Sequence, residues 1–405
     1  MIELLAPAGD FDKLKSAVHF GADAVYFGGS DFSLRAFAGN FGNAQTEEAL
    51  SYLHERGKKG YVAVNIFPRN ADFGALREYL QQLEGRADGA IVTDPGLIEF
   101  ARKVAPRLPL HLSTQANTLN KYAAKFWAEQ GISRIVLARE LTLAEIAEIR
   151  EFLPDSCELE AFVHGAMCIS YSGRCLLSNY LNGRDANRGE CVQACRWQYA
   201  VHSAKLVEAK RQGAPLTLEE DARGSYILNS KDLKLIGYLD QLRAAGVSSF
   251  KIEGRMKTEY YVGTTVNAYR RVLDGRMKVA EADEELEKTG HRAYTTAYFL
   301  GENADTQCVE TSKPDRTCDY AAFVLGKTEG GVFVEQRNRF RAGDLLEAVS
   351  AGRDHGKAFR VRAMTDEEGN PVEDAKLVCQ KLYLACDLDL SAFDMLRKPR
   401  NGAGT

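Results

Sequence analysis

Short apolar runs alternate with longer amphipathic stretches over residues 1–275 of the chain. Most of these runs are too short and too apolar to be half-exposed antiparallel strands, and they suit strands buried on both faces of a parallel sheet. Eight units of strand and helix predict a (β/α)8 TIM-like barrel, with an open doubly wound sheet as the alternative. The eight runs are Glu3–Ala6, Ala24–Phe27, Tyr61–Asn65, Ala90–Thr93, Leu110–Ser113, Arg134–Leu137, Leu159–Val163 and Ser249–Glu253.

The stretches between these runs carry signals for helix boundaries. Their apolar spacing predicts helices at Asp10–Phe20, Thr46–Arg56 and Thr142–Phe152. Each of these begins with a residue type that caps helix N-termini. Gly21 and Gly57 are suited to ending two of the helices, because glycine adopts the left-handed conformation found there.

The pattern changes after the seventh run. A cysteine-rich insertion at about residues 165–225 separates it from the eighth, and insertions of this length are usually functional or disordered. Residues 276–319 predict a helical connection that includes a charged helix at Glu281–Lys288. Short alternating runs between turn sequences predict a small β-barrel at residues 320–396, and residues 397–405 predict a basic tail.

Composition limits the classes of function. The 405 residues are 45% hydrophobic, which is enough for a full core, and their formal net charge is −4. Bulk charge therefore gives no support for nucleic-acid binding, so any RNA contact needs a local basic patch. No apolar run approaches the roughly 20 residues of a membrane span. The first residues lack the features of a signal peptide, so we expect a cytoplasmic protein.

Polar side chains follow nearly every predicted strand, and in a parallel barrel these positions meet at one face. Exposed loops are polar in any barrel, but a lysine within a buried run, such as Lys251, needs a partner or a ligand. Converging arginines suit an anionic small molecule. The candidate catalytic residues are Glu160, His164, Lys251 and Glu253, and the candidate substrate-binding residues are Arg35, Asn65, Gln115, Asn117, Arg139 and Arg255.

The chain has nine cysteines, and four of them form the pattern Cys168-x6-Cys175-x15-Cys191-x3-Cys195. Four thiolates can hold an iron–sulfur cluster or a structural zinc. Zinc sites usually use two closely spaced pairs, and only the second pair here has that spacing, which favours the cluster. Zinc and four incidental cysteines remain as alternatives.

The same insertion is rich in arginine and aromatic residues, a composition suited to phosphate contact and base stacking. A solvated surface has the same composition, so this signal is weak by itself. The candidate RNA-binding residues are Arg174, Arg184, Arg188, Arg196 and Trp197.

Two segments make the chain resemble a known family. The sequence from Glu160 to Cys168, EAFVHGAMC, and the sequence from Gly173 to Ser178, GRCLLS, resemble the signature of the collagenase-like peptidase family U-32. The segments LLAPAG, GADAVYFGG, RGECVQACRW and FKIEGRMK extend the resemblance over most of the chain. Within the family, the chain is most similar to the branch of prephenate-dependent tRNA uridine hydroxylases.

This resemblance implies a tRNA-modifying enzyme that hydroxylates carbon 5 of the wobble uridine in the anticodon loop, with prephenate as co-substrate. It also implies a 4Fe–4S cluster on the four clustered cysteines. The segment between the last clustered cysteine and the LNSKDL motif is shorter than in enteric members. The alternatives are a U-32-type peptidase, a hydroxylase of ribosomal RNA or another anionic aromatic substrate, and a non-enzymatic iron–sulfur RNA-binding protein.

The sequence itself gives little support for a peptidase. His54-Glu55 is followed by Arg56, Gly57 and Lys58, so the zinc-protease pattern H-E-x-x-H is absent there, and no G-x-S-x-G nucleophile elbow occurs in the chain. A cysteine nucleophile with His164 four residues before Cys168 is conceivable. However, a thiol nucleophile needs one activated cysteine, whereas the insertion supplies several at ligand spacing.

Overall fold

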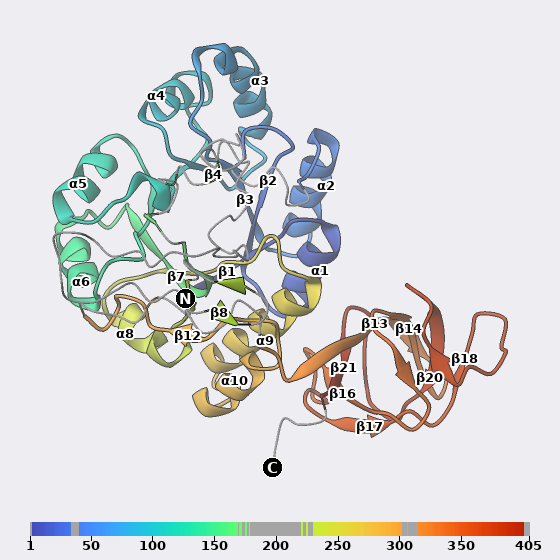
Figure 1. Cartoon of the computed structure of the whole chain (residues 1–405). Coiled ribbons are helices and arrows are strands. Elements are labelled where there is room, and N and C mark those ends of the chain that lie inside the picture. Colours follow the sequence, from blue (N-terminus) through green and yellow to red (C-terminus); the bar gives the residue numbers. More distant parts are fainter. Residues whose placement is uncertain are drawn as a thin grey trace.

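The structure is a computed structural model of the whole chain, shown in Figure 1. It describes residues 2–33, 40–168, 170–171, 175, 178, 220–221, 224–225, 230–301, 306 and 315–400. Most of the cysteine-rich insertion therefore lies outside the described residues. A ring of strands surrounded by helices forms the larger part, and a separate sheet formed by the C-terminal residues lies beside helices α9 and α10.

Eight parallel strands form the closed barrel. They pair in the order β1, β2, β3, β4, β5, β6, β7, β11, and β11 also pairs with β1, which closes the ring. All eight predicted runs are confirmed as strands, and the open sheet is excluded by this closure. The strands are β1 (Glu3–Pro7), β2 (Ala24–Gly28), β3 (Lys59–Val64), β4 (Gly89–Val92), β5 (Leu110–Leu112), β6 (Arg134–Val136), β7 (Glu158–Ala166) and β11 (Ser249–Ile252).

Helices cover the outside of this ring (Figure 1). The side chains of Asp10 and Thr142 accept backbone N–H groups at the starts of α1 and α6, as predicted. Thr46 was predicted to be a cap but lies inside α2, where its hydroxyl donates to the Phe41 carbonyl at 3.4 Å. The helices are α1 (Phe11–His19), α2 (Asn43–His54), α3 (Phe73–Leu83), α4 (Pro95–Val104), α5 (Lys121–Glu129), α6 (Leu143–Phe152), α8 (Leu239–Ala244), α9 (Glu259–Leu273) and α10 (Val279–Leu286).

Strand β7 is longer than its neighbours and leaves the barrel at its carboxyl end. There it pairs antiparallel with β10 (Asp232–Lys234), which pairs in turn with β12 (Tyr294–Thr295). The pairing of β7 with β11 shifts register between Lys251 and Ile252. The insertion therefore leaves the barrel at the end of β7 and returns next to it. Two short strands within it, β8 (Glu220–Asp221) and β9 (Gly224–Ser225), pair with each other.

The C-terminal part contains the predicted β module as a seven-stranded antiparallel sheet that forms a half-barrel. The strands pair in the order β17, β16, β21, β13, β14, β20, β18. They are β13 (Cys318–Thr328), β14 (Gly331–Gln336), β16 (Leu345–Val349), β17 (Ala358–Arg360), β18 (Met364–Thr365), β20 (Lys381–Ala385) and β21 (Met395–Pro399), with a separate pair β15 (Phe340–Arg341) and β19 (Asp374–Ala375).

The start of the expected basic tail is instead the last strand of this sheet. Arg397 belongs to β21 and is fully buried. Its guanidinium donates two hydrogen bonds to Glu285 of α10, at 2.5 and 2.8 Å, and a further one to Glu347 of β16. Burial alone would raise the pKa of Glu285, but Arg397 beside it lowers that pKa to about 2. The basic tail was predicted wrongly because burying an arginine requires charged partners. The partners of Arg397 lie far from it in sequence, so no local pattern shows them.

The barrel and the C-terminal sheet meet in one shared apolar core, beside a second core that lies within the sheet. Met395 and Phe323 of the sheet pack in the same apolar cluster as Phe20 of the barrel. At its edge, the His19 ring of α1 is hydrogen-bonded to the buried carboxylate of Asp394, at 2.7 Å. No helix in the described part of the chain is long and apolar enough to cross a membrane. The shared core fixes the C-terminal sheet against the barrel.

Candidate active site

Charged residues fill the part of the barrel interior that lies at the amino ends of the strands. Arg134 of β6 donates to Glu3 of β1 at 2.6 Å and to Glu158 of β7 at 2.5 Å. The Tyr61 hydroxyl donates to Glu3 at 2.6 Å, and so does the Ser249 hydroxyl at 2.8 Å. Residues at this end of such a barrel usually serve stability. We therefore assign this cluster to the floor of the barrel.

The next layer contains the buried lysine that the sequence singled out. Lys251 Nζ lies 2.6 Å from Glu160 Oε1, and both residues are buried. The other carboxylate oxygen of Glu160 accepts from Arg134 at 3.2 Å. The ammonium also lies 4.3 Å from the centre of the Tyr26 ring. Two predicted catalytic residues, Lys251 and Glu160, are thus partners, and they lie directly above the floor.

The end of β11 brings two more predicted residues to the mouth of the barrel. Glu253 accepts a hydrogen bond from the Tyr26 hydroxyl at 3.0 Å. Arg255 is buried, and its Nη1 donates to the Ser33 hydroxyl at 2.9 Å. A Cβ on Gly28 would lie 2.4 Å from the same nitrogen, so only glycine leaves room for this guanidinium. A carboxylate and a guanidinium therefore share the mouth.

Opposite them, Gln115 and Asn65 form an amide pair. Asn65 Nδ2 donates to Gln115 Oε1 at 2.7 Å, and the hydroxyls of Ser113 and Thr93 lie 3.1 and 3.4 Å from that oxygen. The side-chain oxygen of Gln115 thus has several donors, whereas its Nε2 is buried and has no acceptor within the described ranges. An unpaired buried donor is costly, so this amide is suited to meeting a ligand oxygen. Asn117 follows in the left-handed conformation, with φ of 53°.

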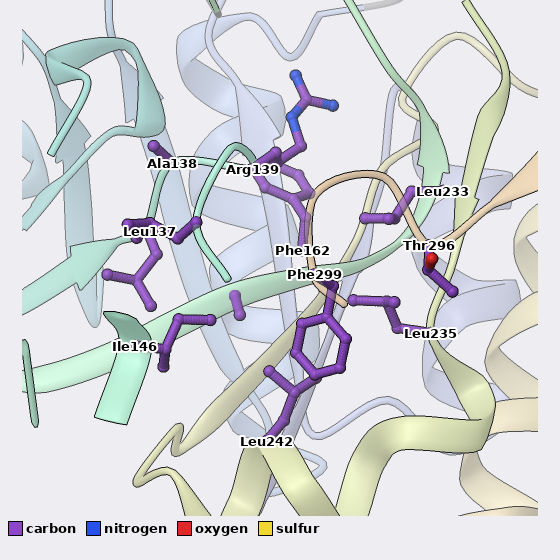
Figure 2. A pocket seen from close by; sticks show the side chains of 12 residues that line it. Leu137, Ala138, Arg139, Ile146, Phe162, Leu233, Leu235, Leu242, Thr296 and Phe299 are labelled. Atoms are coloured by element: carbon purple, nitrogen blue, oxygen red, sulfur yellow. The ribbon is translucent and has the colours of Figure 1, made fainter. Parts of the chain in front are cut away.

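Arg139 lies beside the mouth rather than within the floor. Its guanidinium is 4.9 Å from the centre of the Phe162 ring, and its Nη1 donates to the Ala166 carbonyl at 2.8 Å. Figure 2 shows this guanidinium directed away from the apolar pocket formed by residues such as Leu242 and Phe299. That pocket holds about 20 Å³, room for about one water molecule. It is a packing gap in the core, too small for a substrate.

His164 does not join the other predicted residues at the mouth. The register shift in β7 turns its ring outward, where it lies within 5.5–5.9 Å of the rings of Tyr261, Tyr269 and Tyr294. Tyr269 and Tyr261 belong to α9, outside the barrel. Burial lowers the pKa of His164, so the ring is neutral. This position favours a role on the outer side of β7, away from the barrel interior. The catalytic role of His164 stays a prediction.

Two of the four clustered cysteines are described. Neither Cys168 nor Cys175 forms a disulfide, and both are partly exposed. Cys168 lines a cleft of about 430 Å³ together with Glu140, Tyr171 and Tyr298, and burial raises the pKa of Glu140. The other predicted ligands and basic residues lie outside the described residues: Arg35, Arg174, Arg184, Arg188, Cys191, Cys195, Arg196 and Trp197.

The donor chemistry of these two thiols fits an iron–sulfur cluster. Neither is used in a disulfide, and both are open to solvent at the carboxyl side of β7. Within the described ranges, no group of three or more His, Cys, Asp or Glu side chains could hold a metal ion. A complete cluster site therefore needs the two remaining cysteines of the insertion.

Comparison with known proteins assigns the family. The model of Peptidase family U32 matches residues 9–308, and the model of the family's C-terminal domain matches residues 316–397. The chain belongs to peptidase family U32. This membership, together with the polar mouth of the barrel, marks it as an enzyme.

Three proteins that are similar to this chain carry different names. The chain is 40% identical to the tRNA hydroxylation protein P1 of Bacillus subtilis, over 98% of this chain and 94% of that protein. It is 34% identical to an Escherichia coli 23S rRNA 5-hydroxycytidine synthase, over 77% of this chain and 47% of that protein. It is also 31% identical to a collagenase of Porphyromonas gingivalis, over 74% of each chain.

The sequence analysis missed three residues inside the barrel, two charged ones in its floor and one aromatic residue above them. Glu3 and Arg134 begin two of the predicted strands, and each is a charged residue in an apolar run. The same argument that singled out Lys251 would have found them, since a charge inside a buried strand needs a partner. Tyr26 was missed because an aromatic residue in a strand is unremarkable in sequence, and its contacts with Lys251 and Glu253 depend on the closed barrel.

Proposed function

We propose that this chain is an RNA-hydroxylating enzyme that acts on tRNA and adds a hydroxyl group at carbon 5 of the wobble uridine. The observation that carries the proposal is the similarity to the Bacillus subtilis tRNA hydroxylation protein, which extends over 98% of this chain and so includes both the barrel and the C-terminal sheet. The chain also covers 94% of that relative.

The mouth of the barrel is suited to prephenate as co-substrate. Prephenate carries two carboxylates, and guanidinium groups bind carboxylates through paired hydrogen bonds. Arg255 lies at the mouth, held by the Ser33 hydroxyl, and Gln115 offers a buried amide N–H on the opposite side. Arg139 lies next to β7, against Phe162. The three side chains can hold an anionic ring acid between the strand ends.

The pair below the mouth supplies a fixed charge. Glu160 is shared between Lys251 and the floor residue Arg134. Glu3 and Glu158 already bind Arg134, so Lys251 is the cation of this layer. A preorganised cation under a pocket stabilises negative charge on a bound ligand, because it needs no rearrangement during reaction. Glu253 lies above this layer, and its carboxylate can accept or hold a proton beside the Tyr26 hydroxyl.

A 4Fe–4S cluster is part of the proposal. Cys168, Cys175, Cys191 and Cys195 would hold it, since cysteine thiolates are the ligands of such clusters and the described two form no disulfide. Such a cluster supplies one-electron transfer or a binding point for a ligand. The cleft beside Cys168 would then adjoin it on the face formed by Glu140 and Tyr298.

The test is the nucleoside content of tRNA. We expect a strain that lacks this gene to lose 5-hydroxyuridine-derived wobble nucleosides in mass spectrometry of bulk tRNA, and a plasmid copy to restore them. An Arg255→Gln copy is expected to restore little, because losing a charge-assisted contact to a carboxylate costs about 1.5–3 kcal/mol, or roughly 10- to 150-fold in affinity. Unchanged tRNA nucleosides in the deletion strain would refute the proposal.

Two other functions are tested by analysing ribosomal RNA from the same strain and by a cleavage assay with purified protein. Altered ribosomal RNA with unchanged tRNA would favour the activity named for the Escherichia coli relative. Gelatin cleavage by homogeneous protein, blocked by a cysteine alkylator, would favour the peptidase suggested by the collagenase name. The structure gives that reading little support, since no hydrogen bond joins His164 to Cys168 in the part of the chain that is described.

A further inference from the structure

A second site adjoins the mouth of the barrel. A cleft of about 680 Å³ lies between the loop that joins β11 to α9 and the start of β13 in the C-terminal sheet. Figure 1 shows β13 beginning beside α9, where the two parts of the molecule meet. The described residues that line this cleft come from both parts, so the cleft exists only because the sheet is fixed against the barrel.

The cleft has a charge opposite to that of the whole chain. Its described lining contains four cations, Lys257, Arg316, Arg337 and Arg400, and one carboxylate, Glu259. The chain as a whole has a formal net charge of −4. Four cations around one cleft in an acidic protein form a local basic patch, and such a patch concentrates anions.

Acidic neighbours neutralise these cations only in part. Arg316 and Arg400 share one carboxylate, Asp319, at 3.2 and 2.8 Å, so this trio keeps one positive charge. The two arginine side chains are 47% and 44% exposed. Each guanidinium carries five N–H donors, of which Asp319 accepts two from Arg400. Further donors can therefore meet an anion in the cleft.

The remaining two cations are held more firmly. Arg337 lies 3.1 Å from Glu259 and 2.6 Å from Glu335, so two carboxylates outweigh its single charge. Lys257 donates to the carbonyl of Gly290 at 3.0 Å. The exposed positive charge of the cleft is thus at the Arg316–Arg400 pair, where two guanidinium groups share one carboxylate.

One loop connects this cleft to the mouth. Residues 253–258 follow β11, and within them Glu253 and Arg255 turn into the barrel, whereas Met256 and Lys257 line the cleft. The Met256 side chain is exposed. A ligand that extends from the mouth along this loop would pass directly into the cleft. A small acid would occupy the mouth of the barrel alone, whereas a polymer bound there would extend into the cleft.

We propose that this cleft binds the sugar–phosphate backbone of the RNA substrate outside the catalytic pocket. Arginine and lysine contacts to phosphate position an RNA without reading its sequence. The cleft would hold the part of the RNA that flanks the reacting base, while the mouth holds the base and the acid. This inference rests on the proposed function, because it takes RNA as the polymer.

The test compares two double variants in tRNA binding. We expect Arg316→Gln with Arg400→Gln to weaken the binding of bulk tRNA roughly 10-fold in fluorescence anisotropy at moderate salt. We also expect it to lower the slope of log Kd against log salt by about 2, one for each lost phosphate contact. The control is Arg102→Gln with Lys103→Gln, which removes the same charge from the exposed surface of α4 and is expected to leave both values unchanged.

The possible results separate this inference from the proposed function. Equal tRNA affinity and salt slope in the cleft variant and the control would overturn the cleft as an RNA site, even if the deletion strain loses its hydroxylated nucleosides. Unchanged nucleosides with a cleft-specific loss of tRNA binding would refute the proposed function and keep the cleft. Polyglutamate that binds as tightly as tRNA, and that the cleft variant also loses, would overturn RNA in favour of an acidic peptide. Circular dichroism and urea unfolding of both variants verify that they fold.

Discussion

The ion pair between Lys251 and Glu160 allows a direct test of how the barrel interior works. Lys251→Met keeps most of the side-chain volume and removes the charge, so little cavity is created. Glu160 is fully buried and would retain Arg134 at 3.2 Å as its remaining charged partner. Removing one member of a buried ion pair costs about 3–5 kcal/mol, and the remaining contact favours the lower end, about 3 kcal/mol.

The assay is urea unfolding, followed by the fluorescence of the barrel tryptophan Trp127. A loss of about 3 kcal/mol corresponds to a midpoint lower by about 1 M for a slope near 3 kcal/mol per M. The control Lys103→Met removes an exposed partner of Glu99 and is expected to change stability by less than about 0.5 kcal/mol. An unchanged midpoint for Lys251→Met would refute the reasoning, because it would mean that Glu160 is not held as a buried charge.

A double variant then separates structural from chemical roles. Lys251→Met with Glu160→Gln removes both charges, so most of the lost stability should return. If Lys251 acts only as a partner for Glu160, tRNA hydroxylation should return with it. If its charge stabilises a bound anion, the double variant should be stable and still inactive. Nucleoside mass spectrometry of a complemented deletion strain distinguishes the two.

Three further predictions concern other parts of the molecule. Arg397→Met should lower stability by about 3–5 kcal/mol in urea unfolding, because it leaves Glu285 buried without its main partner. Burial lowers the pKa of His355 to about 4; the unfolded chain takes up this proton first, so stability should fall by up to about 3 kcal/mol as the pH drops from about 6.5 to 4, and by less in His355→Gln. Anaerobically purified protein should contain about four irons per chain, and Cys168→Ser or Cys175→Ser should lose them; stoichiometric zinc without iron would contradict this.

The barrel could be predicted from sequence because each of its strands is marked locally. A strand buried on both faces is a short apolar run, and the eight runs correspond to the eight strands within a few residues. Asp10 and Thr142 were identified as helix caps for the same reason, since capping depends on neighbours along the chain. Strands β10 and β12 were missed because they are three and two residues long, and β10 pairs with β7 while β12 pairs with β10, both across long stretches of sequence.

The site was predicted only in part, and the reason is geometric. Side-chain direction in a strand alternates with each residue, so one register shift reverses it. His164 follows such a shift and faces α9, whereas Glu160, before it, faces the barrel interior. Arg397 shows a second limit, since its partners Glu285 and Glu347 lie far from it in sequence. Both facts depend on contacts that no local pattern records.

The antiparallel pairing of β7 with β10 has a consequence for how this enzyme can change. The chain leaves the barrel after Ala166 and re-enters at Asp232, and these two residues are paired neighbours. The segment between them therefore begins and ends at one place beside the barrel, as a branch of the chain. Such a branch can lengthen, shorten or be exchanged without moving any barrel strand, because the cost of closing a loop rises only slowly with its length. One barrel with a fixed pocket could in this way be fitted to RNAs of different shape.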